Sequence, residues 1–147
     1  MKWTKVLNLN DVCQLVSFDK NVHPPQDLLT VDEYVTWLRR GLEIHCLKDQ
    51  NDNWLGLYQI LQKSEEEIYF AGFGVDHEHH GHGFGQMLMG HMIREYGHKK
   101  LTCKTRESNH IMKYLLGKNN FFRDHDEIDD RNDHWTWWTR YPISNLT

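Results

Sequence analysis

One stretch of the sequence reads Val75-Asp76-His77-Glu78-His79-His80-Gly81-His82-Gly83-Phe84-Gly85-Gln86 and separates two segments of different periodicity. Before it, residues 68–75 are apolar and rich in aromatic and β-branched side chains, which predicts a mostly buried strand. After it, apolar residues recur at helical spacing as far as Tyr96, which predicts an amphipathic helix over residues 83–96. The stretch itself is therefore predicted to be a glycine-rich turn between a strand and a helix.

Such a turn suits a bound anion. Successive backbone N–H groups and the helix N-terminus point at the ligand, which is usually a phosphate, and glycine lets that ligand approach the backbone closely. The spacing excludes two well-known phosphate loops. A dinucleotide fingerprint would have its third glycine at Gln86, and a Walker A loop would end in Gly-Lys-Ser/Thr. A plain connecting turn is the alternative interpretation.

The spacing resembles the acyl-coenzyme A loop of the GNAT superfamily of N-acetyltransferases, usually written Gln/Arg-x-x-Gly-x-Gly/Ala. The matching residues are His80, Gly81, His82, Gly83, Phe84 and Gly85, which follow a strand ending in valine and a short acidic turn. His80 departs from the pattern, because it stands at the Gln/Arg position. The resemblance implies that this loop binds the pyrophosphate of acetyl-coenzyme A, mainly through backbone N–H groups.

A second stretch extends the resemblance. Family members often carry Asn-x-x-Ala-x-x-Leu-Tyr-x-Lys-x-Gly-Phe after the fifth strand, and residues 109–121 lie on this frame. The positions that agree are Asn109, Leu115, Lys118 and Phe121. Leu116 stands at the tyrosine position and Asn120 at the glycine position. Since that tyrosine is the family's commonest general acid, and leucine cannot donate a proton, the general acid is unassigned. Tyr114 lies about 200° around the helix and is no simple substitute.

The rest of the chain predicts the family's order of elements. The expected strands are residues 3–7, 43–48, 54–61, 68–75, 100–105, 120–123 and 134–140. Helices are expected after Asn8 or Asn10, after the capping-box pair Thr30 and Glu33, and after Asn109. The predicted fold class is a GNAT-like α/β (α+β) fold, with a mixed, largely antiparallel central sheet of about six to seven strands and about four flanking helices. Residues 1–147 are expected to form a single domain.

Composition limits the class of protein. The net charge is -4 and no basic stripe is visible, which argues against a nucleic-acid partner. No segment reaches the roughly 20 apolar residues of a membrane span, and the N-terminus lacks the apolar core of a signal peptide. Cys13, Cys46 and Cys103 are far apart and odd in number, so they are expected to be reduced core residues. A soluble cytoplasmic protein is predicted.

The resemblance also implies which residues contact the co-substrate, acetyl-coenzyme A. They are Phe73, Gly74, Val75, His80, Gly81, His82, Gly83, Phe84, Gly85, Gln86 and Asn109. In the family, the pantetheine arm pairs with the backbone just before the glycine loop, where one N–H polarises the thioester carbonyl. Asn109 would contact the pantetheine, and its alternative role is a helix N-cap.

The catalytic residues are left unknown. Candidates for a general base are Glu43, Glu67, Glu78, His134 and Tyr141, although each is better explained as a surface or strand residue than as a catalyst. The acidic segment over residues 124–133 is expected to be a loop bordering the acceptor site. Its charge would attract a cationic amine, such as a polyamine, an aminoglycoside, a lysine side chain or a protein N-terminus. The alternative is a solvated surface loop.

Three tryptophans and four histidines have more than one interpretation. Alternation places Trp135 and Trp137 on one strand face and Trp138 on the other. Core packing, a homodimer contact or an acceptor-pocket wall would each use them. The clustered histidines are His77, His79, His80 and His82. Imidazole binds zinc, copper or nickel, but the second histidine of a zincin motif falls on Gly81, so no metal is assigned.

The sequence therefore predicts an N-acetyltransferase that moves the acetyl group from acetyl-coenzyme A directly to a primary amine. Two other classes stay open. The first is a non-catalytic acyl-coenzyme A-binding regulatory module, which Leu116 favours. The second is a histidine-rich metal-binding protein.

Overall fold

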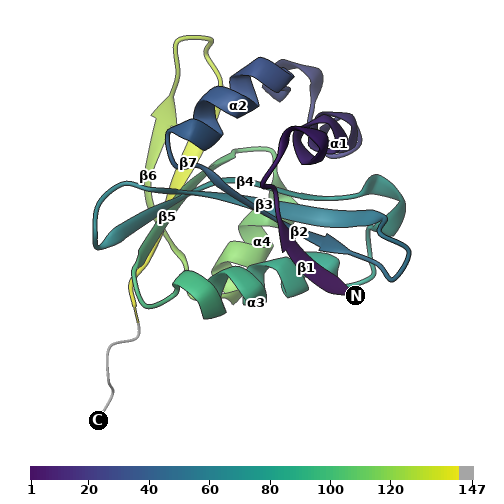
Figure 1. Ribbon diagram of the computed structural model, residues 1–147. Coiled ribbons are helices and arrows are strands. Elements are labelled where there is room, and N and C mark those ends of the chain that lie inside the picture. The colour runs from purple at the N-terminus through teal and green to yellow at the C-terminus, as the bar shows by residue number, and fades with distance from the viewer. Residues whose placement is uncertain (143–147) are drawn as a thin grey trace. The chain divides into compact units, whose positions relative to one another are not determined.

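The computed structural model describes residues 1–142 of the 147-residue chain (Figure 1). The helices and strands in chain order are β1 (Lys2–Lys5), α1 (Leu9–Asp19), the 3-10 helix η1 (Pro25–Asp27), α2 (Val31–Arg39), β2 (Glu43–Lys48), β3 (Trp54–Gln62), β4 (Glu67–Val75), the 3-10 helix η2 (His77–His79), α3 (Phe84–Tyr96), β5 (Lys100–Arg106), α4 (His110–Lys118), β6 (Phe122–Ile128) and β7 (His134–Arg140). The strand order is β1-β2-β3-β4-β5-β7-β6 in one seven-stranded sheet. The predicted α/β class, with a mixed and mostly antiparallel sheet, is confirmed.

The chain divides into two compact units. The first contains residues 1–61 and 71–88, and the second contains residues 62–70 and the described residues from 89 onward. Strand β4 and helix α3 each contribute to both units. No helix of the described residues is both long enough and apolar enough to cross a membrane.

In the first unit, α1 and α2 lie side by side and pack on the strands β2 and β3 (Figure 1). The buried core between them consists of Val6, Val12, Leu15, Phe18, Tyr34, Leu42, Ile44, Cys46 and Leu57. Strand β2 is antiparallel to both of its neighbours, with Lys5 opposite His45 and Glu43 opposite Ile60. Apolar residues of two amphipathic helices thus cover one face of the strands.

The predicted helix starts in this unit are confirmed. Asn8 caps α1 by accepting a hydrogen bond from the Asp11 N–H at 2.8 Å. Thr30 and Glu33 form the predicted capping box, each side chain accepting from the other residue's N–H. On α2, Tyr34 is buried and Trp37 is 39% exposed.

In the second unit, β4 runs parallel to β5 from Glu67 to Tyr69, and β7 pairs antiparallel with both β5 and β6. Helix α4 ends in a turn in which the Phe121 N–H donates to the Leu116 carbonyl at 3.0 Å. Asn120 adopts a left-handed φ of 70° within that turn. Asparagine is one of the few residues other than glycine that tolerate this conformation, so Asn120 can do the work of the family's glycine.

The acidic segment differs from its prediction. A loop was expected over residues 124–133, but β6 runs from Phe122 to Ile128 and the connecting turn spans only residues 129–133. The segment forms a strand because it pairs with β7, with Ile128 opposite His134. Charged side chains on an exposed edge strand also discourage pairing with another chain. The acidic composition of this segment therefore did not predict that it forms a strand.

The cysteines divide into two environments. Cys46 and Cys103 are buried, as expected, but Cys13 is exposed on α1, so the prediction of three core cysteines was wrong for Cys13. All three thiols are free. Burial raises the pKa of Cys103 to about 12 and also raises the pKa of Cys46. Neither buried thiol is therefore suited to act as a thiolate nucleophile.

Candidate functional site

The glycine loop begins where β4 ends. The N–H of Asp76 donates to the Leu55 carbonyl of β3 at 2.9 Å, which fixes the end of the strand. Gly81 and Gly83 then adopt φ values of 83° and 82°, and a Cβ atom added to either would meet no atom within 4 Å. The backbone conformation, and not local packing, therefore requires glycine at both positions. The space beside them is open to a ligand.

Helix α3 begins directly after this loop. Its first internal hydrogen bond runs from the Met87 N–H to the Gly83 carbonyl at 3.1 Å. The N–H groups of the first turn precede that bond and have no acceptor inside the helix. No acidic residue stands in the first turn to oppose an anion. The loop and the positive end of the helix therefore suit a bound anion such as a phosphate.

The histidines of the loop have local partners. Nε2 of His80 lies 3.1 Å from the Val75 carbonyl oxygen, so a proton on Nε2 links the loop back to the end of β4. Nδ1 of His79 lies 3.2 Å from a carboxylate oxygen of Asp76. The ring of His82 stacks with that of Phe84, with centroids 6.1 Å apart. Across the described residues, no group of three or more His, Cys, Asp or Glu side chains could hold a metal ion.

Two predicted positions of interest lie on α4, in the second unit. Asn109 caps the helix, with its Oδ1 accepting from the Met112 N–H at 3.2 Å. Leu116 is fully buried, so the family's tyrosine position holds an inert core residue. Tyr114 is 68% exposed and lies on a different helix face, as the spacing predicted.

The candidate general bases named from the sequence are scattered. Glu43 pairs with Lys5 at 3.8 Å, and Glu67 pairs with Lys100 at 3.3 Å. The other three candidates, Glu78, His134 and Tyr141, have exposed side chains. Nothing in their surroundings singles out one of them as a proton acceptor.

A buried carboxylate that the sequence analysis missed lies at the end of α1. Asp19 is only 2% exposed, and its Oδ2 accepts a hydrogen bond from the Tyr34 hydroxyl. Its Oδ1 lies 3.3 Å from Nδ1 of His23, whose side chain is 21% exposed. The sequence shows that Asp19 and His23 are four residues apart and that a Pro-Pro pair follows His23. It does not show that Asp19 is buried.

Tyr34 anchors this cluster from α2. Burial raises the pKa of the Tyr34 hydroxyl, and its hydrogen bond to Asp19 raises it further. The side chain of Gln59, on β3, also hydrogen-bonds to Tyr34. The phenol therefore stays protonated and remains a donor to the carboxylate at neutral pH.

The same cluster touches the predicted cofactor-binding strand. A Cβ atom on Gly74 would lie 2.9 Å from the Val22 side chain and 3.5 Å from Cε1 of His23. Glycine at this position thus lets the α1–α2 connection pack directly against β4. The His23 imidazole lies beside the segment of β4 that was predicted to bind the thioester end of the co-substrate.

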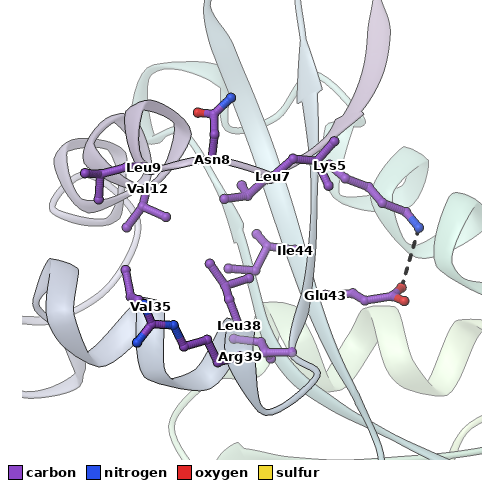
Figure 2. Close-up of a pocket in the computed structure, with 12 residues that line it drawn as sticks. Lys5, Leu7, Asn8, Leu9, Val12, Val35, Leu38, Arg39, Glu43 and Ile44 are labelled. Atoms are coloured by element: carbon purple, nitrogen blue, oxygen red, sulfur yellow. Dashed lines mark ion pairs between the residues drawn. The ribbon is translucent and has the colours of Figure 1, made fainter.

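A pocket of about 580 Å³ lies elsewhere in the first unit (Figure 2). It is lined by the β1–α1 connection, α1, α2 and the start of β2, with aliphatic side chains such as Val12 and Leu38 facing its interior and the Lys5–Glu43 ion pair at its rim. None of the residues that line this pocket belongs to the glycine loop, so the pocket is distinct from the loop.

The tryptophans of β7 follow the predicted alternation. Trp138 is buried and donates its indole N–H to Thr105 at 3.0 Å. On the other face, Trp137 donates to Glu127 at 2.5 Å and Trp135 donates to Asp129 at 2.9 Å. Two carboxylates of the acidic segment are thus engaged by indole groups.

Comparison with known proteins identifies the family. The sequence profile of the Acetyltransferase (GNAT) family matches residues 8–121, and the chain belongs to this family. No curated protein sequence matches the chain. With the family come its established properties: the protein is an acyltransferase of the N-acetyltransferase class, and acetyl-coenzyme A is its acetyl donor.

Several solved structures share the fold. The ribosomal-protein-S18-alanine N-acetyltransferase from Escherichia coli has a TM-score of 0.80 at 15% identity, over 99% of this chain and 97% of that one. A mutant of the spermidine N-acetyltransferase from Vibrio cholerae has a TM-score of 0.79 at 14% identity, over 100% and 98%. Ard1 from Thermoplasma volcanium has a TM-score of 0.78 at 14% identity, over 98% and 100%. At such low identity these likenesses concern the fold alone.

Proposed function

We propose that this protein transfers the acetyl group of acetyl-coenzyme A directly to a primary amine of a cationic acceptor. The observation that carries the proposal is the glycine loop at the end of β4. Gly81 and Gly83 have left-handed backbones beside open space, and the loop leads into the N-terminus of α3. A loop of this kind, in a chain of the GNAT family, supports acyl-coenzyme A binding.

We propose the following contacts for the co-substrate. The pyrophosphate binds the backbone N–H groups of residues 80–86, and the pantetheine arm pairs with the main chain of residues 73–75. These three residues lie beyond the part of β4 that pairs with β5, which spans Glu67 to Tyr69. Asn109 has an amide nitrogen in addition to the oxygen that caps α4, and we assign that nitrogen to the pantetheine.

Charge supports a cationic acceptor. The chain carries a net charge of -4, and β6 with its following turn is rich in carboxylates. Some of these are already paired, for example Asp133 with Arg106 at 3.1 Å, so the attraction comes from the summed field rather than from one free carboxylate. Among the proteins of similar fold, one is named for spermidine and another for the alanine of a ribosomal protein. Polyamines, aminoglycosides, lysine side chains and protein N-termini are the classes to test.

We further infer that residues 1–147 act as one acetyltransferase domain, because the family match over residues 8–121 includes parts of both units. We also infer a cytoplasmic location, which the three free cysteines support.

The test is a calorimetric titration of the untagged protein with acetyl-coenzyme A in the presence of a chelator, followed by an assay of thiol release with a panel of amines. We expect binding, and release that depends on a cationic amine. Binding without release on any amine would contradict the transferase and favour a regulatory module. If acetyl-coenzyme A does not bind, the glycine loop is an ordinary connecting turn and the proposal is wrong.

A further inference from the structure

We propose that His23, held in orientation by the buried Asp19, is the general base that takes a proton from the acceptor amine. This inference rests on the proposed acetyl transfer and adds a catalytic residue to it. It starts from His23, whose ring lies against both a buried carboxylate and the β4 segment proposed to hold the pantetheine.

The backbone fixes the position of His23. The carbonyl of Asp19 accepts hydrogen bonds from the N–H groups of Val22 and His23, at 3.1 Å and 2.9 Å. Pro24 follows immediately, and a residue before proline is restricted to extended conformations. The imidazole therefore projects from a short, constrained turn and not from a freely moving loop.

The carboxylate selects the tautomer of the ring. Oδ1 of Asp19 is buried and has no well-aligned hydrogen bond from any described residue, and Nδ1 of His23 lies 3.3 Å from it. A carboxylate only accepts hydrogen bonds, so the favourable arrangement puts the proton of the neutral imidazole on Nδ1. Nε2 then carries a lone pair. This is the arrangement by which an aspartate orients a catalytic histidine in hydrolases.

The ring of His23 lies against the β4 segment proposed to hold the pantetheine. Its Cε1 would lie 3.5 Å from a Cβ on Gly74, and Nε2 is bonded to that carbon. The side chain is 21% exposed, so an amine can reach it from solvent. Asp19 contacts the ring of His23, and the neutral Tyr34 lies behind that carboxylate.

The proton balance of the step is as follows. Nε2 of His23 takes one proton from the ammonium group, which leaves a neutral amine. The nitrogen lone pair forms the C–N bond to the acetyl carbon, and the C–S bond breaks with its electron pair passing to sulfur. The second proton lost by the nitrogen is transferred to the sulfur, giving the free thiol. The imidazolium then returns its proton to solvent.

The kinetic test is the variant His23→Gln, with His98→Gln as a control at an exposed histidine after α3. We expect His23→Gln to lower kcat/KM for the amine about 100-fold, which is typical for loss of a general base. The affinity for acetyl-coenzyme A, measured by calorimetry, should change less than about twofold, because the phosphate-binding loop is untouched. The acid limb of the pH profile should disappear in His23→Gln and persist in His98→Gln.

A second readout does not depend on turnover. In the free protein labelled with ¹⁵N-histidine, NMR should show His23 as the Nδ1–H tautomer at neutral pH, and Asp19→Asn should abolish that preference. Finding the Nε2–H tautomer, or wild-type kcat/KM with an intact acid limb in folded His23→Gln, would overturn the assignment while leaving the acetyltransferase standing. If the unaltered protein binds acetyl-coenzyme A but acetylates no amine of the panel, the proposed function fails, and the role of His23 with it.

Discussion

The glycine loop and the α1–α2 connection flank the same end of β4, but they are built on opposite principles. The loop consists of consecutive residues, is largely exposed and offers backbone N–H groups. The α1–α2 connection instead brings together side chains distant in sequence, namely Asp19, His23 and Tyr34, around a buried carboxylate. The loop resembles a known sequence motif, whereas no sequence motif predicts the cluster of Asp19, His23 and Tyr34.

The difference shows which kinds of site a sequence displays. Backbone recognition depends on φ values that a few residue types adopt, so glycines at alternate positions mark it directly. Side-chain recognition depends on burial and on contacts between separate elements, which no local pattern specifies. The following predictions test each region by disturbing the property on which it depends.

The largest effect is expected in the glycine loop. Gly83→Asp places a negative charge where the pyrophosphate is proposed to bind, on a backbone with φ of 82°. We expect the dissociation constant for acetyl-coenzyme A to rise at least 100-fold, which is about 2.7 kcal/mol. Gly83→Asn is the matched control, because asparagine has nearly the same shape as aspartate without the charge. This variant should lose much less affinity for acetyl-coenzyme A. Unchanged affinity in a folded Gly83→Asp protein, measured by calorimetry, would refute the loop assignment.

Leu116→Tyr tests a position where the motif and the packing disagree. The leucine is fully buried, so the larger ring should lower the free energy of unfolding by about 1–3 kcal/mol, as overpacking usually does. Acetyl-coenzyme A affinity should stay nearly unchanged. If kcat nonetheless rises, a missing general acid limits the natural protein; if kcat stays constant, another group or water protonates the thiolate. Urea denaturation and steady-state kinetics measure the two effects.

Tyr34→Phe removes the donor to the buried carboxylate. We expect the free energy of unfolding at pH 7 to fall by about 1–3 kcal/mol, because Oδ2 of Asp19 loses its hydrogen bond. The folded pKa of Tyr34 is raised above its ordinary value of 10.0, so this tyrosine stabilises the fold below pH 10 and loses that contribution as the pH rises further. The variant should therefore show a smaller alkaline loss of stability than the wild type. If the wild type and the variant lose equal free energy of unfolding above pH 10, the fold does not raise the pKa of Tyr34.

The smallest effect is expected at a backbone position of the second unit. Asn120 has φ of 70° at the place where the family carries glycine. Asn120→Gly should raise the free energy of unfolding by up to about 1 kcal/mol, since glycine adopts this conformation without steric cost. Asn119→Gly, at a neighbouring residue with φ of -105°, is the control and should not stabilise. Thermal denaturation of both variants distinguishes conformational strain from a general effect of glycine.

The secondary structure shows the same division between local and non-local information. Capping residues such as Asn8 and Thr30 marked helix starts correctly, because a cap is a contact within four residues. The acidic strand β6 was missed because its conformation depends on pairing with β7 and not on its own composition. Cys13 was misplaced for a similar reason, since residue type alone does not say which helix face it occupies.

By itself, the sequence determined the α/β class, the strand, turn and helix around the glycine loop, and the resemblance to acetyltransferases. These features are local, because they rest on periodicity and on glycine's access to left-handed backbone conformations. Only the tertiary structure decided that Leu116 is a core residue, that β6 is a strand, and that Asp19 is buried next to His23 and Tyr34. Burial and contacts between distant residues are properties of the packed chain, so the proton acceptor inferred for the amine could be identified only after folding was known.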